Sequence, residues 1–384
     1  MRNVSAPPRL ISGSTLIAAC TLALACTVAD RQPAKWIVKA TPETSIGETF
    51  GDDDYTFQLA GFARFLPGGR IVVADKGVLD VRIFGSDGTL EKRIGRRGQG
   101  PGEFAEIGGL WLTSKGAIAL WDASHRRITT YNAQGDLLGT HRVTNYPEGG
   151  NLEILLGALS DDEIIIASLF PGEAGPQTTP DRWPLGRFGP DGEFKEKAGE
   201  VRGMWRYNRH PVPFSPMPHM IVYRDSVYVA DGYEGEIAVR DLSGAAVRVI
   251  RLPQLKPPSA QAIWTALESK LRERKAGLYL EYLRDDRVPR ENRYPQIAGL
   301  LVDDQGYIWV KAYDPFVDPI WLRSYPLWPA PGGEWRVIRP DGSIVATVRM
   351  PPGVRPLEIK GNRLLGVALD ELDVQRIVVH TIQR

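Results

Sequence analysis

The side chains that could perform chemistry in this sequence are few and scattered. None of the histidines has the H-x-x-x-H or H-E-x-x-H spacing of a zinc site. The five histidines are His125, His141, His210, His219 and His380. Neither a G-x-S-x-G nucleophile elbow nor a cysteine–histidine pair is present. We therefore identify no catalytic residue, no metal ligand and no cofactor, and we expect binding rather than catalysis.

The glycine-rich stretch 95–104 resembles a phosphate-binding loop only in composition. It lacks the GK[ST] ending, and a strand-like run rather than a helix follows it. A link between two repeated units, with glycines at positive φ, explains the stretch better. Its side chains Arg96 and Arg97 remain candidate ligand-binding residues.

Aromatic side chains in two other stretches are the stronger candidates for ligand binding. Aromatic rings on stiff loops bind apolar or sugar-like surfaces at a low entropic cost. The candidates are Trp205, Tyr207, His210, Tyr313, Trp321 and Trp328. The last three lie in a proline-rich stretch, 312–333. The alternative is that these rings pack against the rest of the protein.

The elements that must position these residues are repeated. Gly69 and Gly116 are 47 residues apart, and so are Gly88 and Gly135. A fixed offset of this size indicates a repeat architecture. Six polar turns, each followed by a short apolar strand, occur at 68–69, 115–116, 161–162, 224–225, 305–306 and 361–362.

A second turn follows later in five of these units, so each unit contains two hairpins. Four-stranded antiparallel sheets bury both faces by stacking around an axis. The pattern predicts an all-β fold, a six-bladed β-propeller over residues 36–384. The sixth unit lacks a fourth strand, and we expect the strand Trp36–Ala40 to complete it and close the ring. Residues 41–54 are polar and acidic and are expected to form a loop.

One segment, about 257–284, does not fit a blade. Ser259 is a candidate helix N-cap, and Ile263, Leu267 and Leu271 follow at helical spacing. We expect a helical insertion lying across one face of the ring.

Aspartate and arginine recur at matching places in three units. A carboxylate and a guanidinium at repeated positions suit a structural ion pair between neighbouring strands. The expected pairs are Asp75 with Arg82, Asp122 with Arg127, and Asp231 with Arg240.

The N-terminus has the features of a signal peptide, expected over residues 1–25 and followed by a tether over 26–35. Arg2 and Arg9 precede an apolar run too short and too interrupted to span a membrane. Cys26, or alternatively Cys20, is the candidate lipid-anchor residue, and ordinary cleavage of a secreted protein is the alternative. Both cysteines of the chain lie here, so no disulfide holds the fold.

The link at 95–104, together with the run 122–128, resembles the NHL-type repeat, G-x-G-x-G-P-G-x-F followed by D-x-x-x-x-R-I. The wider chain resembles bacterial six-bladed β-propeller lipoproteins that carry such NHL-like repeats. That resemblance implies a propeller in the cell envelope. Relatives include lyases and lactonases as well as binding platforms.

We therefore expect a non-catalytic cell-envelope propeller, in the periplasm or at the outer membrane, that binds a protein, peptide or glycan partner through its loop-bearing face. It would be a monomer that meets the membrane only through an N-terminal lipid. With a formal charge of +1, the chain has no basic bias for nucleic acid. The alternative is a metal-assisted lyase or hydrolase, lactonase-like, with Ca²⁺ or Zn²⁺ at the axis. A purely structural spacer is a third hypothesis.

Overall fold

A computed structural model of the chain describes residues 32–143, 152–170, 180–207, 210–215, 217–232, 234–253, 260–273, 275–290, 294–314, 331–370 and 374–384. Residues 33–384 form one compact unit. Cys20 and Cys26 therefore lie outside the described residues.

This unit contains six blades. Blades one to four are separate four-stranded antiparallel sheets, and an N-terminal strand joins blades five and six into one nine-stranded sheet. Blade one contains β3 (Ala60–Phe65), β4 (Ile71–Asp75), β5 (Asp80–Phe84) and β6 (Leu90–Ile94). Blade two contains β9 (Ile107–Leu112), β10 (Ile118–Asp122), β11 (Arg127–Tyr131) and β12 (Leu137–Arg142). Blade three contains β13 (Leu152–Ala158), β14 (Ile164–Leu169), β15 (Arg182–Phe188) and β16 (Phe194–Arg202).

The second half of the chain repeats the arrangement. Blade four contains β19 (His219–Tyr223), β20 (Ser226–Ala230), β21 (Glu236–Arg240) and β22 (Ala246–Arg251). Blade five contains β23 (Ile297–Val302), β24 (Ile308–Ala312), β25 (Gly333–Ile338) and β26 (Ile344–Met350). Blade six contains β27 (Val354–Lys360), β28 (Arg363–Leu369) and β29 (Gln375–Gln383).

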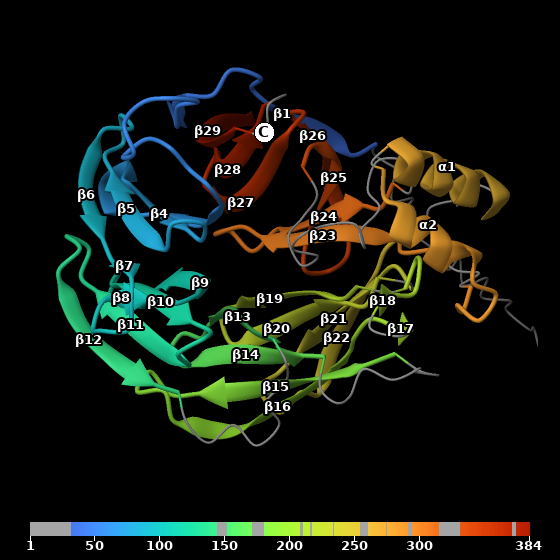
Figure 1. The fold of residues 1–384 in the computed structure, drawn as a ribbon, viewed down its shortest axis with the longest axis horizontal. Coiled ribbons are helices and arrows are strands. Elements are labelled where there is room, and N and C mark those ends of the chain that lie inside the picture. Colours follow the sequence, from blue (N-terminus) through green and yellow to red (C-terminus); the bar gives the residue numbers. More distant parts are fainter. Residues whose placement is uncertain are drawn as a thin grey trace, which may run out of the picture. The chain divides into compact units, whose positions relative to one another are not determined.

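The first strands of the blades form the inner ring (Figure 1). Each contacts the first strand of the next blade, in the order β3, β9, β13, β19, β23 and β27, and β27 contacts β3 in turn. The sheets therefore close on themselves around an axis, and the predicted six-bladed propeller is confirmed.

The N-terminal segment closes the ring, but it does so with two strands rather than one. β1 (Ala34–Val38) pairs antiparallel with β29 through Ile37 and Val38, and it also pairs parallel with β26. β2 (Thr44–Ile46) pairs antiparallel along β29 and supplies the fourth strand of blade six. The expectation of a loop over 41–54 is thus wrong at β2. Its short polar sequence hides a strand whose Ile46 is buried in the core.

Aliphatic side chains fill the space between blades. Val72, Ile83 and Ile94 of blade one pack in one cluster with Ile118 and Leu120 of blade two. Burying a side chain of this kind contributes about 1.5–3 kcal/mol to folding. Interfaces of this type hold the ring together without a disulfide.

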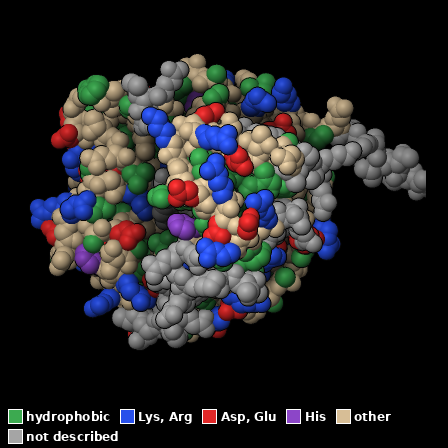
Figure 2. Space-filling view, turned by 45° about the vertical axis from the view of Figure 1, so that its right-hand side comes forward, with side chains coloured by type: hydrophobic (Ala, Val, Ile, Leu, Met, Phe, Trp, Pro, Cys, Tyr) green, Lys and Arg blue, Asp and Glu red, His purple; other side chains and the backbone are tan. Residues whose placement is uncertain are grey.

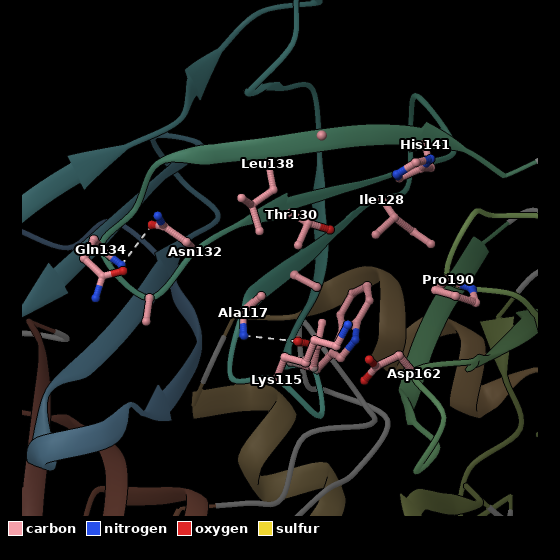
Figure 3. Close-up of a pocket in the computed structure, with 15 residues that line it drawn as sticks. Lys115, Ala117, Ile128, Thr130, Asn132, Gln134, Leu138, His141, Asp162 and Pro190 are labelled. Atoms are coloured by element: carbon pink, nitrogen blue, oxygen red, sulfur yellow. Dashed lines mark hydrogen bonds between the residues drawn. The ribbon is translucent and has the colours of Figure 1, made fainter.

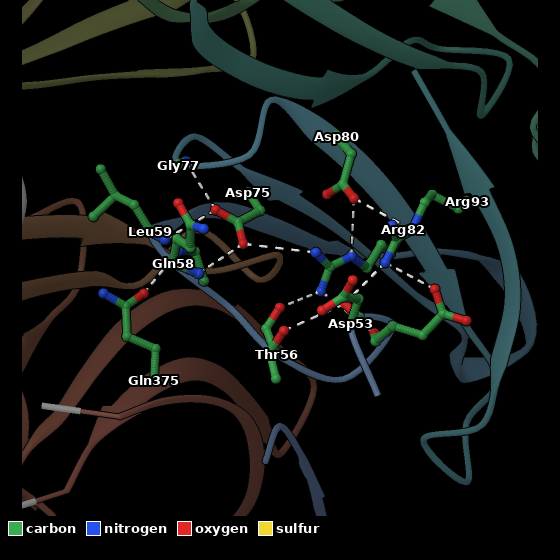
Figure 4. Close-up of polar contacts among 12 residues, drawn as sticks. Asp53, Thr56, Gln58, Leu59, Asp75, Gly77, Asp80, Arg82, Arg93 and Gln375 are labelled. Carbon is green, nitrogen blue, oxygen red and sulfur yellow. Dashed lines mark hydrogen bonds and ion pairs between the residues drawn. The ribbon is translucent and has the colours of Figure 1, made fainter. Parts of the chain in front are cut away.

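The predicted pair of Asp75 and Arg82 forms part of a buried polar network (Figure 4). The Arg82 guanidinium lies 3.8 Å from Asp75 and 3.2 Å from Asp80. Asp75 also accepts hydrogen bonds from the backbone of Gln58 and Leu59, in the link that enters blade one. The aspartate therefore ties that link to the blade, which is a structural role.

Blade two repeats this device. Asp122 lies 3.5 Å from Arg127 and accepts from the backbone of Ala105 and Glu106. Blade four does not repeat it.

In blade four, the strand register places Arg240 opposite Val227, four residues from Asp231 along the chain. Because each strand residue advances about 3.3 Å, this places Arg240 well away from Asp231. Its guanidinium donates 2.6 Å to the carbonyl of Glu200. The predicted pair of Asp231 and Arg240 is therefore wrong.

The two ends of the sheets differ in their connections. At one end, here called the hairpin face, strands are joined by short turns such as 113–117 and 224–225. At the other end, the insertion face, lie the long connections 170–181, 203–218, 252–296 and 313–332. Since the strands of each blade alternate in direction, each of these four connections begins and ends at the same end of the sheets.

The connection from blade four to blade five contains two helices, α1 (Ala260–Glu273) and α2 (Gly277–Arg284), as predicted. The α1 residues Ile263, Leu267 and Leu271 are fully buried in a core cluster shared with blades three, four and five. The helices thus cover part of the insertion face. No helix among the described residues is long and apolar enough to cross a membrane.

Candidate functional site

Arg96 and Arg97 lie on the insertion face, in the link from blade one to blade two. They form β7 (Arg96–Arg97), which pairs parallel with β8 (Glu103–Phe104). Arg96 makes a 2.7 Å ion pair with Glu103, and Arg97 donates 3.4 Å to the carbonyl of Gly77. Both side chains are exposed.

The glycines of this link adopt the predicted positive φ angles at three positions, Gly95, Gly98 and Gly102. A Cβ atom added to Gly95 would lie 2.5 Å from the ring of Phe104. The link is therefore a tightly folded connection, and no helix follows it to form a phosphate site.

Of the three candidates in the proline-rich stretch 312–333, Tyr313 is the one that lies among the described residues. This side chain is only 6% exposed and belongs to the core cluster under α1. For Tyr313 the burial therefore supports the packing alternative. Trp321 and Trp328 lie outside the described residues.

Trp205, Tyr207 and His210 lie in the link from blade three to blade four. This link contains a small hairpin of β17 (Arg206–Tyr207) and β18 (His210–Pro211), in which Tyr207 pairs with His210. Trp205 is half-buried, and its carbonyl accepts 2.8 Å from the backbone of Val212 at the base of the hairpin.

The hairpin meets α2 through aromatic rings. The ring of His210 lies 5.2 Å from that of Tyr282 and 6.0 Å from that of Tyr279. The Tyr282 hydroxyl lies 3.4 Å from the carbonyls of His210 and Pro211, to which it donates. We call Tyr207, His210, Tyr279 and Tyr282 the tyrosine–histidine cluster.

Burial raises the pKa of Tyr282, and the neighbouring Tyr207, Asp285 and Tyr279 raise it further. Tyr282 therefore stays a neutral hydrogen-bond donor. Beside it, Arg287 donates to both carboxylate oxygens of Asp285 at 2.9 Å, which lowers the pKa of Asp285.

The cluster is accessible. His210 is exposed, and the three tyrosines are half-buried. Leu278, the neighbour of Tyr279 in α2, is 83% exposed. An exposed aliphatic side chain beside four partly open rings suits contact with an apolar or sugar-like surface.

A buried ion pair fixes the hairpin beneath the cluster. Arg206 binds Asp181 through two hydrogen bonds of 2.8 and 3.1 Å, and both side chains are buried. The guanidinium also lies 4.8 Å from the ring of Phe170, which in turn packs edge-on against Trp183. The rings are thus presented from a stiff base, which lowers the entropic cost of binding.

A second group of polar side chains surrounds the insertion-face end of the inner strands. Arg126 of blade two lies 3.2 Å from Glu153 of blade three. Arg355 of blade six donates 3.0 Å to the carbonyl of Ala60 in blade one. Burial lowers the pKa of Arg355 to about 9 and raises the pKa of Glu153. Lys76, over the ring of Phe62, also has its pKa lowered by burial.

Reasoning from the sequence did not find these charged residues, nor Tyr279 and Tyr282. The two tyrosines are three residues apart in a helix that was predicted, so their common face could have been noticed. Acidic and basic side chains are interspersed over the side of the molecule that Figure 2 shows. Among the described residues, no group of three or more His, Cys, Asp or Glu side chains could hold a metal ion.

Comparison with known proteins agrees with this architecture. Residues 61–149 match the model of a family, DUF5128, described as a 6-bladed beta-propeller. The chain is a six-bladed β-propeller. No curated protein matches its sequence.

Solved structures of similar fold cover nearly the whole propeller. A DUF4221 family member from Bacteroides vulgatus is 13% identical, with a TM-score of 0.53, and the alignment covers 92% of this chain and 99% of that one. A protein from Bacteroides fragilis named as exported has 11% identity, a TM-score of 0.49 and coverages of 92% and 98%. A gluconolactonase from Xanthomonas campestris has 14% identity, a TM-score of 0.44 and coverages of 91% and 96%. At 13% identity, the likeness to the DUF4221 family member concerns the fold alone.

Proposed function

We propose that this propeller is an exported, non-catalytic protein of the cell envelope that binds a protein, peptide or glycan partner through its insertion face. The tyrosine–histidine cluster is the contact surface. The observation that carries the proposal is the ring contact of His210 with Tyr279 and Tyr282, at the edge of an exposed patch that includes Leu278.

Two features support this choice of face. The four connections 170–181, 203–218, 252–296 and 313–332 begin and end there, and loops placed on a rigid scaffold are where binding residues concentrate. The cluster also rests on the buried pair of Arg206 and Asp181 and on the buried stripe of α1. Its rings are therefore held before a partner arrives.

The envelope location rests on the N-terminal segment. A lipid on Cys26, or on Cys20, would hold the propeller at a membrane surface. Mass spectrometry of the protein purified from membranes tests this: a lipid on the N-terminal cysteine is expected, and a free N-terminus produced by ordinary cleavage would contradict it.

The binding function is tested with the full chain as bait in envelope extracts and glycan arrays, followed by titration of the purified partner. Removing an aromatic contact typically costs about 1–2 kcal/mol, so His210→Ala and Tyr279→Ala should each weaken binding about five- to thirtyfold. Val247→Lys, on the exposed outer edge of blade four, is the control. A partner whose affinity is unchanged by both cluster variants would reject this surface.

The alternative is a lyase or hydrolase at the propeller axis. The observation in its favour is a set of titratable groups near the insertion-face end of the inner strands, where burial lowers the pKa of Lys76 and raises the pKa of Glu153. Such shifts suit proton transfer but also arise in structural ion pairs. Stoichiometric Ca²⁺ or Zn²⁺ in the purified protein, with lactone hydrolysis lost in Glu153→Gln, would favour the enzyme over the binding protein.

A further inference from the structure

Blades one, two and four keep the same spacing between their turns, so their residues can be compared position by position. In blade one, Val72, Ile83 and Ile94 face blade two and are almost fully buried. In blade four, Tyr228, Val239 and Ile250 occupy the same positions and face blade five. Both sets fill the space between neighbouring sheets.

Blade two departs from this pattern. Its residues at the three positions are Ala119, Thr130 and His141, as the matching strand registers show. All three are smaller or more polar than their counterparts. The face of blade two that is turned toward blade three is therefore hollow where the other blades are filled.

The outer edge of this interface is open for a related reason. In blade one, Lys92 reaches across to Asp136 of blade two with a 2.6 Å ion pair. In blade four, Arg248 reaches across to the carbonyl of Pro340 in blade five at 3.1 Å. The equivalent residue of blade two is Gly139, which has no side chain to span the gap.

The result is a groove of about 510 Å³ between blades two and three. Figure 3 shows Ile128, Thr130 and Leu138 of blade two on one side, with Asp162 and Pro190 of blade three on the other. Trp111, Ala117 and Ala119 also line it. A volume of this size lies within the range of roughly 300–1,000 Å³ that is usual for small-molecule sites.

The polar lining favours an anion. The side chains of Lys115 and His141 line the groove, and neither makes a hydrogen bond or ion pair with another described residue. Among the lining residues that the structure describes, Asp162 alone carries a carboxylate, and it accepts two hydrogen bonds from Ser114, at 2.5 Å from its backbone amide and 2.9 Å from its hydroxyl. The charged Lys115 side chain thus lies in the same groove as the apolar residues Ala117 and Ala119.

We propose that this groove binds a small organic anion with a flat apolar body, which lies on the Ala117 and Ala119 floor beside Trp111 and directs its acidic group to Lys115 and His141. The site is on the hairpin half of blade two, and it does not depend on the function proposed for the insertion face. A partner could be absent from one site while a ligand occupies the other.

The test uses the full chain and two fluorescent probes, the anion 8-anilinonaphthalene-1-sulfonate and its uncharged analogue N-phenyl-1-naphthylamine. Saturable 1:1 binding of the anion is expected. Restoring the residues of blade one, with Ala119→Val and Gly139→Lys, should weaken binding of both probes at least tenfold. A Cβ atom at Gly139 meets only the His141 ring, at 3.5 Å, so the variant should fold and melt no lower than the parent protein.

Two further variants test the position of the site and its preference for an anion separately. Lys92→Gly opens the edge of blade one but leaves Val72, Ile83 and Ile94 in place, so it should not change probe affinity. Lys115→Met should weaken binding of the anion several-fold and leave binding of the neutral probe unchanged. Probe binding that survives the filled groove would overturn the site, and equal losses for both probes in Lys115→Met would overturn the preference for an anion.

Discussion

The hydroxyl of Tyr282 in α2 donates to the carbonyl of His210 in β18, and the two rings lie 5.2 Å apart. These residues are separated in the sequence by all four strands of blade four and by the first helix of the insertion. Their contact joins the helical insertion to the link between blades three and four. The candidate binding surface exists only because these two connections meet.

Replacing Tyr282 with phenylalanine should loosen this junction. The variant loses the hydrogen bonds to the carbonyls of His210 and Pro211, which at 3.4 Å are long, so we expect a loss of about 0.5–1 kcal/mol in unfolding free energy. Partner affinity should fall as well. Tyr223→Phe, which removes a similar 3.4 Å bond to Asp304 between blades four and five, is the matched control. It should lose similar stability without losing affinity, and urea unfolding with partner titration measures both.

The pair of Arg206 and Asp181 should matter far more for stability than the exposed pairs. In Arg206→Met the carboxylate of Asp181 is left in a buried site, which costs about 3–5 kcal/mol. Arg251→Met, which removes an exposed pair with Glu236, should cost less than about 1 kcal/mol. Denaturant unfolding of both variants compares them, and equal losses would show that the hairpin does not depend on this pair.

Stability should fall in strongly alkaline solution because of Tyr131. Burial raises the pKa of its hydroxyl to about 12, whereas a tyrosine in the unfolded chain ionises near pH 10. The folded protein therefore keeps a proton that the unfolded chain releases, so this contribution is present below about pH 10 and is lost as the pH rises toward 12. The unfolding free energy of Tyr131→Phe should decline less over that window, and parallel curves for the two proteins would refute the assignment.

Closure of the ring should depend on β2. Ile46 is 2% exposed and packs with Phe65, Val73 and Ile377 across blades one and six. Truncation in Ile46→Ala should cost about 2–4 kcal/mol. Ile37→Ala, at a β1 position that is 51% exposed, should cost little. Hydrogen exchange should show faster exchange in β29 of the Ile46 variant, and unchanged exchange there would mean that β2 does not close the ring.

Much of the architecture could be read from the sequence because it is set by local patterns that repeat. The fixed offset between turns specified the blades, and the spacing of Ile263, Leu267 and Leu271 specified α1. β2 was missed because its three residues, two of them polar, carry no alternation. Its strand conformation comes from pairing with β29, more than three hundred residues away in the sequence.

Only part of the candidate site could be predicted from the sequence. Tyr207 and His210 could be named as aromatic loop residues, but their neighbours on α2 are fixed by how the insertion packs. Tyr313 is a second case, since a tyrosine at the start of a proline-rich connection gives no sign that it will be buried. Whether a side chain is buried depends on how the long connections pack over one another. No local pattern in the sequence shows that packing.

The central claim is that the tyrosine–histidine cluster contacts a partner. Photo-crosslinking in cells tests this claim most directly. p-Benzoylphenylalanine placed at position 279 lies in the cluster, and the same residue at position 247 lies on the outer edge of blade four. Position 279 should yield one discrete crosslinked species in the envelope fraction, and position 247 should yield none. A crosslink from position 247 with none from position 279 would contradict the account.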